Sequence, residues 1–133
     1  MTNSLLANCP VVTDGAWGTE LQARGLQSGD IPDAWNLTHP DRVAEVARAY
    51  VKAGSRVILT NTFGANRVRL GGHGIAAQVP EINQRGVEIH ANEPQEHRLD
   101  LVANAVDPWA GHVALRLGDG RDVGTEEPDA YDR

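Results

Sequence analysis

The sequence predicts an α/β fold in which parallel strands alternate with helices. Two short apolar runs rich in β-branched residues, residues 9–13 and 56–60, each end in polar residues, as buried strands often do. An amphipathic helical pattern separates them, and the chain returns from that helix through a tight turn. A parallel strand–helix–strand unit is the natural arrangement of such a segment.

The predicted helix between the two strands has a start, an apolar face and an end. Thr38 is expected to cap it, with Pro40 in the first turn and Asp41 three residues after the cap, which resembles a capping box. Gly54 is expected to end it, because glycine readily adopts the left-handed conformation that closes helices. The apolar positions recur with helical spacing and define one face: Val43, Val46, Ala47, Tyr50 and Val51.

Shorter helices are expected on either side of this unit. Residues 19–26 predict a short helix that stops near Gly25, and residues 67–74 predict a short helix with a glycine-rich turn. Residues 75–90 predict a further helix with Pro80 in its first turn, since proline inside a helix costs about 3 kcal/mol. Its apolar face is expected to contain Ile75, Val79, Ile82 and Ile89.

Composition narrows the classes of function. The 133-residue chain carries a formal net charge of −6 and no basic cluster, which argues against binding to nucleic acid or to a membrane surface. A single cysteine, Cys9, cannot form an internal disulfide or a cysteine zinc cluster by itself. We see neither a signal peptide nor the ~20 apolar residues of a membrane span, so a cytoplasmic protein is expected.

Polar residues follow both predicted strands at their carboxyl ends, where parallel α/β folds gather functional groups. Asp14 could pair with a substrate ammonium group, and the backbone around Gly15 could receive a carboxylate. Thr60, Asn61 and Thr62 would add neutral hydrogen bonds. This pattern favours a site for a small zwitterion such as an amino acid. The alternative is that both clusters are an ordinary turn and an ordinary strand end.

Three segments carry a resemblance to a known family: residues 12–26, 32–70 and 73–89. Together they resemble the homocysteine S-methyltransferase family, in order and with similar spacing. Its homocysteine-binding domain occurs alone, in betaine-dependent enzymes, and at the start of cobalamin-dependent methionine synthase. The most specific parts are DGAWGTEL after the first strand and TNTFGAN after the second.

The resemblance implies a (β/α)8 TIM barrel, of which this chain would hold the first two to three β/α units, because such a barrel needs about 250 residues. It also implies a zinc ion that binds the homocysteine thiol as a thiolate, the form that attacks a methyl donor. By position, Asp14 matches the acidic residue that helps hold the substrate's amino group. Gly15 matches the backbone that receives its carboxylate, and Thr62 a threonine near the amino-acid portion. Asn61 and Asn36 also match family positions, where they are expected to support the pocket.

The zinc ligands of the family have no counterpart in this chain. They are three cysteines, one on a later strand and an adjacent pair near the end of the barrel, and Cys9 matches none of them. The histidines show no metal-ligand spacing and are expected at surface or helix-end positions: His39, His73, His90, His97 and His112. We therefore expect no metal site within this chain, although the family implies zinc.

The character of the sequence changes near residue 90. We predict a family-like N-terminal part of the barrel over residues 1–90 and a divergent, acidic, Gly- and Asp-rich tail over 91–133, expected to be poorly ordered. Within the tail, residues 99–106 are a candidate replacement strand, and residues 112–117 form a second apolar run. The hypothesis is that the tail is foreign to the family, from a frameshift, a truncated gene copy or a fragmentary gene model.

Two functions from different classes follow. The first is an enzyme, or part of one, that transfers a methyl group from a small-molecule donor to the thiol of homocysteine. The second is a non-catalytic remnant that binds an amino acid weakly or acts by association with another chain. A nucleotide-binding function has weaker support from the sequence, because the chain has neither a G-x-G-x-x-G segment nor a P-loop lysine. The sequence identifies neither the methyl donor nor the oligomeric state.

Overall fold

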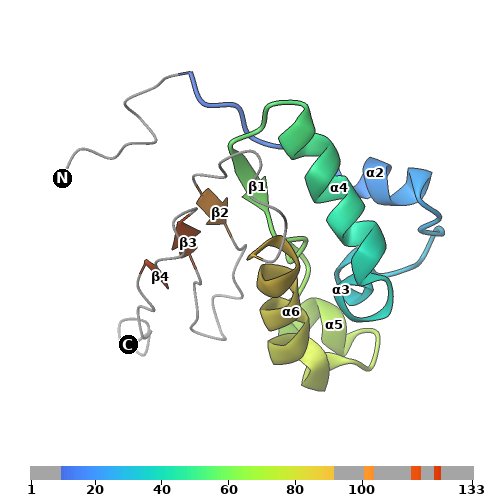
Figure 1. Ribbon diagram of the computed structural model, residues 1–133. Helices are drawn as coiled ribbons and strands as arrows, with labels where there is room; N and C mark the ends of the chain where they lie inside the picture. Colours follow the sequence, from blue (N-terminus) through green and yellow to red (C-terminus); the bar gives the residue numbers. More distant parts are fainter. Residues whose placement is uncertain (1–9, 92–100, 104–114, 118–121, 124–133) are drawn as a thin grey trace.

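The computed structural model describes residues 10–91, 101–103, 115–117 and 122–123 (Figure 1). Its helices are α2 (Trp17–Ala23), α3 (Trp35–Thr38), α4 (Pro40–Lys52), α5 (Arg67–Gly71) and α6 (Val79–Ala91). Two short 3-10 helices, η1 (Pro32–Ala34) and η2 (Ala76–Gln78), precede α3 and α6. The strands are β1 (Val57–Leu59), β2 (Leu101–Ala103), β3 (Leu115–Leu117) and β4 (Asp122–Val123). Figure 1 shows the helices gathered on one side of the strands.

The sheet is parallel around β1. Thr13 forms a parallel bridge to Val57, and β2 pairs in parallel with β1, with Val57 opposite Leu101. Helices α2 to α4 lie between Thr13 and β1 in the chain, and α5 and α6 lie between β1 and β2. The parallel direction predicted for the strand–helix–strand unit is therefore confirmed, although its first strand is reduced to a bridge at Thr13. A second parallel crossover follows it.

The remaining strands make the sheet mixed. β3 is antiparallel to β2, and β4 is antiparallel to β3. A (β/α)8 barrel would continue with parallel strands, so the predicted partial barrel agrees with the structure only at Thr13, β1 and β2. The barrel itself stays a prediction.

The first predicted strand is shorter and less buried than expected. Within the described part of residues 9–13, Thr13 forms a bridge to Val57 and the carbonyl of Val12 accepts from the Arg56 N–H at 2.8 Å. The side chain of Val12 is 56% exposed. Helix α2 also begins at Trp17, two residues earlier than predicted. Cys9 lies outside the described residues.

Helix α4 has the predicted apolar face but not the predicted cap. Pro40 is its first residue, and His39 occupies the cap position without a side-chain hydrogen bond to the helix. The prediction that Thr38 is the cap is wrong, because Thr38 is the last residue of α3. Its hydroxyl donates to the carbonyl of Ala34 at 3.2 Å, the backward bond that serine and threonine often make in helices. Gly54 follows α4 with a φ of +106°, as its predicted role requires.

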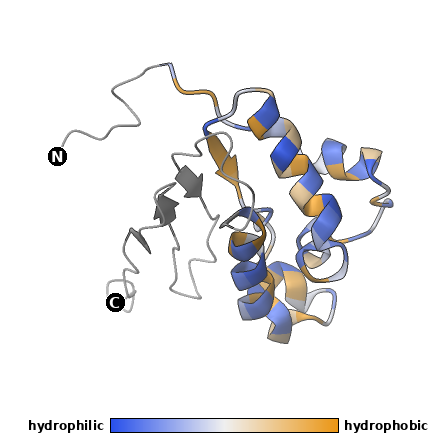
Figure 2. Ribbon diagram, in the orientation of Figure 1, coloured by the Kyte–Doolittle hydropathy of each residue, from blue (hydrophilic) through white to orange (hydrophobic). Residues whose placement is uncertain are grey.

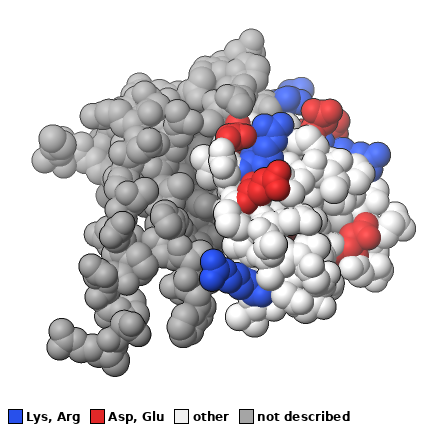
Figure 3. All heavy atoms as spheres, turned by 90° about the horizontal axis from the view of Figure 1, so that it is seen from below, with Lys and Arg blue, Asp and Glu red and all other residues white. Residues whose placement is uncertain are grey.

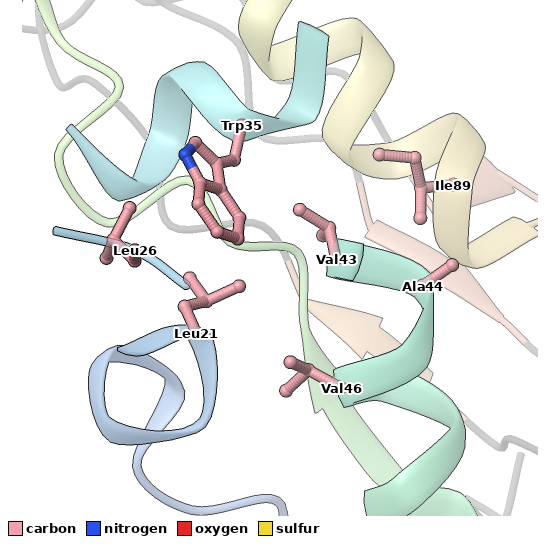
Figure 4. Close-up of a cluster of buried hydrophobic side chains, with 7 residues drawn as sticks. All are labelled: Leu21, Leu26, Trp35, Val43, Ala44, Val46 and Ile89. Atoms are coloured by element: carbon pink, nitrogen blue, oxygen red, sulfur yellow. The ribbon is translucent and has the colours of Figure 1, made fainter. Parts of the chain in front are cut away.

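The core lies between α2, α3, α4 and α6. Figure 4 shows the side chains of one buried cluster pointing toward one another from these helices. Its members are Leu21, Leu26, Trp35, Val43, Ala44, Val46 and Ile89. Figure 2 shows the matching alternation of hydrophobic and hydrophilic residues along α4, whereas β1 is hydrophobic throughout. The amphipathic face predicted for α4 is therefore confirmed.

Helix α6 positions the end of β1. Pro80 is its second residue, as predicted, and Val79, Ile82 and Ile89 are buried. Val79 and Ile82 form a second cluster with Ala65 and Leu70, which follow β1 in the chain. The helix thus packs against the segment that leaves the strand.

Three short strands lie within residues 91–133, where the sequence predicts a divergent tail. β2 falls in the run of residues 99–106 that is a candidate replacement strand, and it pairs with β1 as such a strand should. The rest of the tail, including its expected disorder, lies outside the described residues. The division near residue 90 and the origin of the tail stay predictions.

One face of the described part shows no dominant charge. Figure 3 shows acidic and basic side chains interspersed on the face turned to the viewer, without an extended basic region among the described residues. None of the described helices is long and apolar enough to cross a membrane.

Candidate functional site

Asp14 joins the two polar clusters that follow the predicted strands. Its backbone N–H donates to the carbonyl of Val57 at 3.0 Å. Its Oδ2 accepts hydrogen bonds from the backbone N–H of Leu59 at 2.7 Å and from the indole N–H of Trp17 at 2.6 Å. The first turn, the end of β1 and the start of α2 therefore meet at one carboxylate.

Within the described part of the chain, the hydrogen bonds of the Asp14 carboxylate are all made by one oxygen, Oδ2. The side chain is half-buried, and Oδ1 accepts no hydrogen bond from any of the described residues. A carboxylate held at one oxygen can still accept a charge-assisted hydrogen bond at the other. The geometry at Asp14 is thus compatible with the predicted contact to an ammonium group.

Gly15 is exposed and lies against Tyr50 of α4. A Cβ atom at this position would lie 3.2 Å from the Tyr50 hydroxyl oxygen, a close approach that favours glycine here. The Tyr50 hydroxyl donates to the carbonyl of Ala16 at 3.3 Å. Burial raises the pKa of Tyr50, and the carboxylates of Glu20 and Asp14 raise it further, so this hydroxyl stays a donor. The sequence indicates only an apolar helix position for Tyr50.

The hydroxyls of Thr60 and Thr62 lie inside the protein. Both side chains are buried, and their Oγ1 atoms are 2.8 Å apart. Both threonines follow β1, and Thr60 comes directly after Leu59, whose backbone N–H donates to Asp14. The structure therefore brings Thr62 to the predicted end of the sheet, while its contact with a substrate stays a prediction.

Asn61 adopts an unusual backbone conformation that Asn36 supports. Its φ is +54°, and it is the one described residue other than glycine with a positive φ. Its amide nitrogen donates to Asn36 Oδ1 and to the carbonyl of Pro32, both at 2.9 Å. Asn36 in turn donates to the carbonyls of Asn61 at 3.0 Å and Ile82 at 3.2 Å. These bonds favour the supporting role expected for the two asparagines, and direct binding by Asn61 stays a prediction.

Gly86 of α6 packs directly on this segment. A Cβ atom there would lie 2.6 Å from the carbonyl oxygen of Thr60, 2.8 Å from Thr62 Cγ2 and 2.9 Å from Asn36 Nδ2. The backbone of α6 therefore approaches the end of β1 as closely as a glycine allows. Sequence reasoning missed this contact, although a glycine inside a helical pattern was the available signal.

Asp33 is a buried carboxylate that holds the loop after Thr62. It is 4% exposed, and its Oδ1 accepts a hydrogen bond from the backbone N–H of Gly64 at 2.8 Å. Burial raises the pKa of Asp33 above its ordinary value of 3.8, against the opposing effects of the Gly64 N–H and the Arg69 charge. No sequence pattern indicates a role for Asp33.

Asp33→Asn should change the free energy of unfolding more favourably at neutral pH than in acid. Because the folded-state pKa of Asp33 is raised, the folded chain binds more protons than the unfolded chain between the two pKa values. Stability is therefore lost as the pH rises through this window, and asparagine removes that loss while keeping an acceptor for Gly64. Urea unfolding at about pH 7 and about pH 4 measures the difference between variant and parent.

Asp33→Ala is the matched control for this prediction. It removes the acceptor as well as the charge, and it leaves the Gly64 N–H without its partner. It should be less stable than Asp33→Asn at both pH values. A difference between Asp33→Asn and the parent that does not change with pH contradicts the prediction.

The described residues do not fit the zinc ion that the family implies. Over residues 10–90, no three His, Cys, Asp or Glu side chains lie close enough together to hold a metal ion. His39 and His73 are exposed, as expected. His90 is at the end of α6, as expected, but it is buried, with Nδ1 2.6 Å from the carbonyl of Gly86. His97 and His112 lie outside the described residues.

Two hollows open on the described surface away from Asp14. One, of about 420 Å³, is lined by residues that include Trp35, His39 and His73. The other, of about 450 Å³, lies along α6 at Glu81 and Arg85. Neither includes any of the predicted site residues.

Comparisons with known proteins identify relatives. A sequence model of the family described as homocysteine S-methyltransferase matches residues 11–132. Methionine synthase from Mycobacterium tuberculosis is 36% identical over 91 residues, covering 64% of this chain and 8% of that protein. Homocysteine S-methyltransferase from Escherichia coli is 29% identical over 117 residues, covering 78% of this chain and 37% of that protein.

A solved structure agrees with these matches. The metallated form of the homocysteine methyltransferase MmuM from Escherichia coli has a TM-score of 0.65 and 28% sequence identity, covering 80% of this chain and 41% of that chain. This chain thus spans less than half the length of each of these relatives. The family match covers most of this chain. The chain belongs to the homocysteine S-methyltransferase family.

Proposed function

We propose that this chain binds the amino-acid end of homocysteine and forms that part of a methyltransferase site. Asp14 binds the ammonium group, and the exposed backbone at Gly15 receives the carboxylate. Thr62 lies beside the amino-acid portion, and Asn61 supports the segment that carries it. The observation that carries the proposal is the Asp14 carboxylate, which is held at Oδ2 by Leu59 and Trp17 and is open at Oδ1.

The chemistry of the ligand matches these groups. Homocysteine presents one ammonium, one carboxylate and one thiol. An ammonium–carboxylate contact in a half-buried site is a charge-assisted hydrogen bond, and backbone N–H groups suit a carboxylate. The methyl donor is a second small molecule. We keep a cytoplasmic location as a prediction from the sequence.

Methyl transfer itself requires groups that the described residues do not provide. In the family, zinc supplies the thiolate form of homocysteine. The described residues contain no group of three possible metal ligands, and the chain has one cysteine, Cys9, where the family uses three. We therefore propose that this polypeptide binds homocysteine without transferring a methyl group by itself.

Calorimetric titration of the purified chain tests the binding. L-Homocysteine is compared with 4-mercaptobutanoate, which lacks the ammonium group, and with 3-mercaptopropylamine, which lacks the carboxylate. Homocysteine should bind at least about tenfold more tightly than either analogue, because each lost charged contact costs about one factor of ten. Equal affinities for the three ligands, or no binding of homocysteine, contradict the proposal.

A separate assay tests the absence of catalysis. The chain is incubated with one equivalent of Zn²⁺, homocysteine and either betaine or S-adenosylmethionine, and methionine is measured by mass spectrometry. We expect no methionine above the protein-free control and less than stoichiometric zinc after gel filtration. Stoichiometric zinc together with methionine formation would show that the chain is an enzyme by itself.

A further inference from the structure

We infer that Trp17 is a positioning residue for the ammonium subsite, and that its indole N–H fixes Asp14 for the substrate. The inference rests on the proposed function, in which Asp14 binds the ammonium group of homocysteine. It adds a residue that acts through Asp14 rather than by touching the ligand's reacting atoms. It also gives the chain a spectroscopic reporter of binding.

The geometry around Asp14 supports this role. The indole Nε1 of Trp17 lies 2.6 Å from Asp14 Oδ2, and the backbone N of Leu59 lies 2.7 Å from the same oxygen. These donors come from different elements, the first residue of α2 and the last residue of β1. Two donors on one oxygen restrict rotation of the carboxylate, so Oδ1 keeps one position relative to the end of the strand.

The indole is itself held in place from two sides. Its ring centroid lies 6.4 Å from that of Tyr50 on α4 and 5.5 Å from that of His90 on α6, both in tilted arrangements. Trp17 also packs against the buried cluster around Leu21 and Val46. The packing of α2, α4 and α6 therefore sets the orientation of the indole N–H group. The hydrogen bond from this group in turn orients the Asp14 carboxylate.

The role is specific to tryptophan at this position. Phenylalanine can keep most of the ring contacts with Tyr50 and His90, but it has no donor for Asp14. Trp17→Phe therefore removes the hydrogen bond with little loss of packing. Leu59 still donates to Asp14 in this variant, so the carboxylate loses one of its two restraints.

Calorimetry on Trp17→Phe tests the inference. The variant should bind homocysteine about tenfold more weakly than the parent, as for the loss of one hydrogen bond to a charged group. Its affinity for 4-mercaptobutanoate should be unchanged, because that ligand has no ammonium group for Asp14. Trp35→Phe is the matched packing control, since it alters the buried cluster against which Trp17 packs but removes no donor to Asp14. Any change that it causes should be the same for both ligands.

Fluorescence supplies a second measurement that does not depend on the folding of Trp17→Phe. The chain has three tryptophans, so Trp35→Phe combined with Trp109→Phe leaves Trp17 as the only emitter. Saturating homocysteine should shift its emission, and 4-mercaptobutanoate should not. An unchanged emission with homocysteine overturns the inference, as does an equal loss of affinity for both ligands in Trp17→Phe, or no loss. Failure of the parent to bind homocysteine at all would instead contradict the proposed function.

Discussion

Gly86→Ala should lower the free energy of unfolding by about 3 kcal/mol, an effect of the size that overpacking produces in a closely packed interior. The added Cβ would lie 2.6 Å from the carbonyl oxygen of Thr60 and 2.9 Å from Asn36 Nδ2. The backbone carbonyl cannot rotate away as a flexible side chain could, so α6 must move from the end of β1. Urea unfolding followed by circular dichroism measures the loss.

The sign of this effect distinguishes it from helix propensity. In an exposed helix, alanine is more favourable than glycine by about 1 kcal/mol. Gly18 of α2 is the matched control, because a Cβ there would meet no atom within 4 Å. Gly18→Ala should therefore stabilise the chain slightly. A Gly86→Ala variant as stable as the parent contradicts the close packing of α6 on the strand end.

Asn36→Ala should lower the free energy of unfolding by about 3 kcal/mol, because each buried group left without its partner costs about 1–3 kcal/mol. Asn36 is fully buried, donates to the carbonyls of Asn61 and Ile82, and accepts from the Asn61 amide. Its loss also removes one of the two acceptors that hold the Asn61 amide, whose backbone has a positive φ. We expect weaker binding of homocysteine in parallel, since Thr62 follows Asn61 directly.

An exposed amide provides the control for Asn36. Gln84 on α6 makes an exposed hydrogen bond to Glu88, and Gln84→Ala should change the free energy of unfolding by less than about 0.5 kcal/mol. The two variants are compared by urea unfolding under the same conditions. If Asn36→Ala loses no more stability than Gln84→Ala, the asparagine pair does not support the strand end.

Local sequence patterns were sufficient for the main elements. The spacing of Val43, Val46 and Ala47 predicts the buried face of α4, because helical periodicity needs no knowledge of the partner that covers it. Gly54 and Pro80 likewise act through their own backbone geometry. The cap of α4 was predicted wrongly at Thr38, because a separate turn of helix, α3, occupies the residues just before α4.

Contacts between distant segments could not be predicted in the same way. The approach of Gly86 to Thr60 and the pairing of Asn36 with Asn61 depend on how α3 and α6 pack at the end of β1. The family resemblance indicated Asp14, but no periodicity or motif indicated its bond to Trp17. A residue that is required by a tertiary contact leaves little pattern in the neighbouring sequence. A residue that is required by helix or turn geometry leaves a clear one.

The central claim is that Asp14 holds the ammonium group of homocysteine, and calorimetry on Asp14→Asn tests it most directly. Asparagine keeps an oxygen for Leu59 and Trp17 but removes the charge, so homocysteine should bind at least about tenfold more weakly. The affinity for 4-mercaptobutanoate should be unchanged. Asp41→Asn, at an exposed position of α4, should bind both ligands like the parent. An Asp14→Asn variant that binds homocysteine as tightly as the parent would contradict the account.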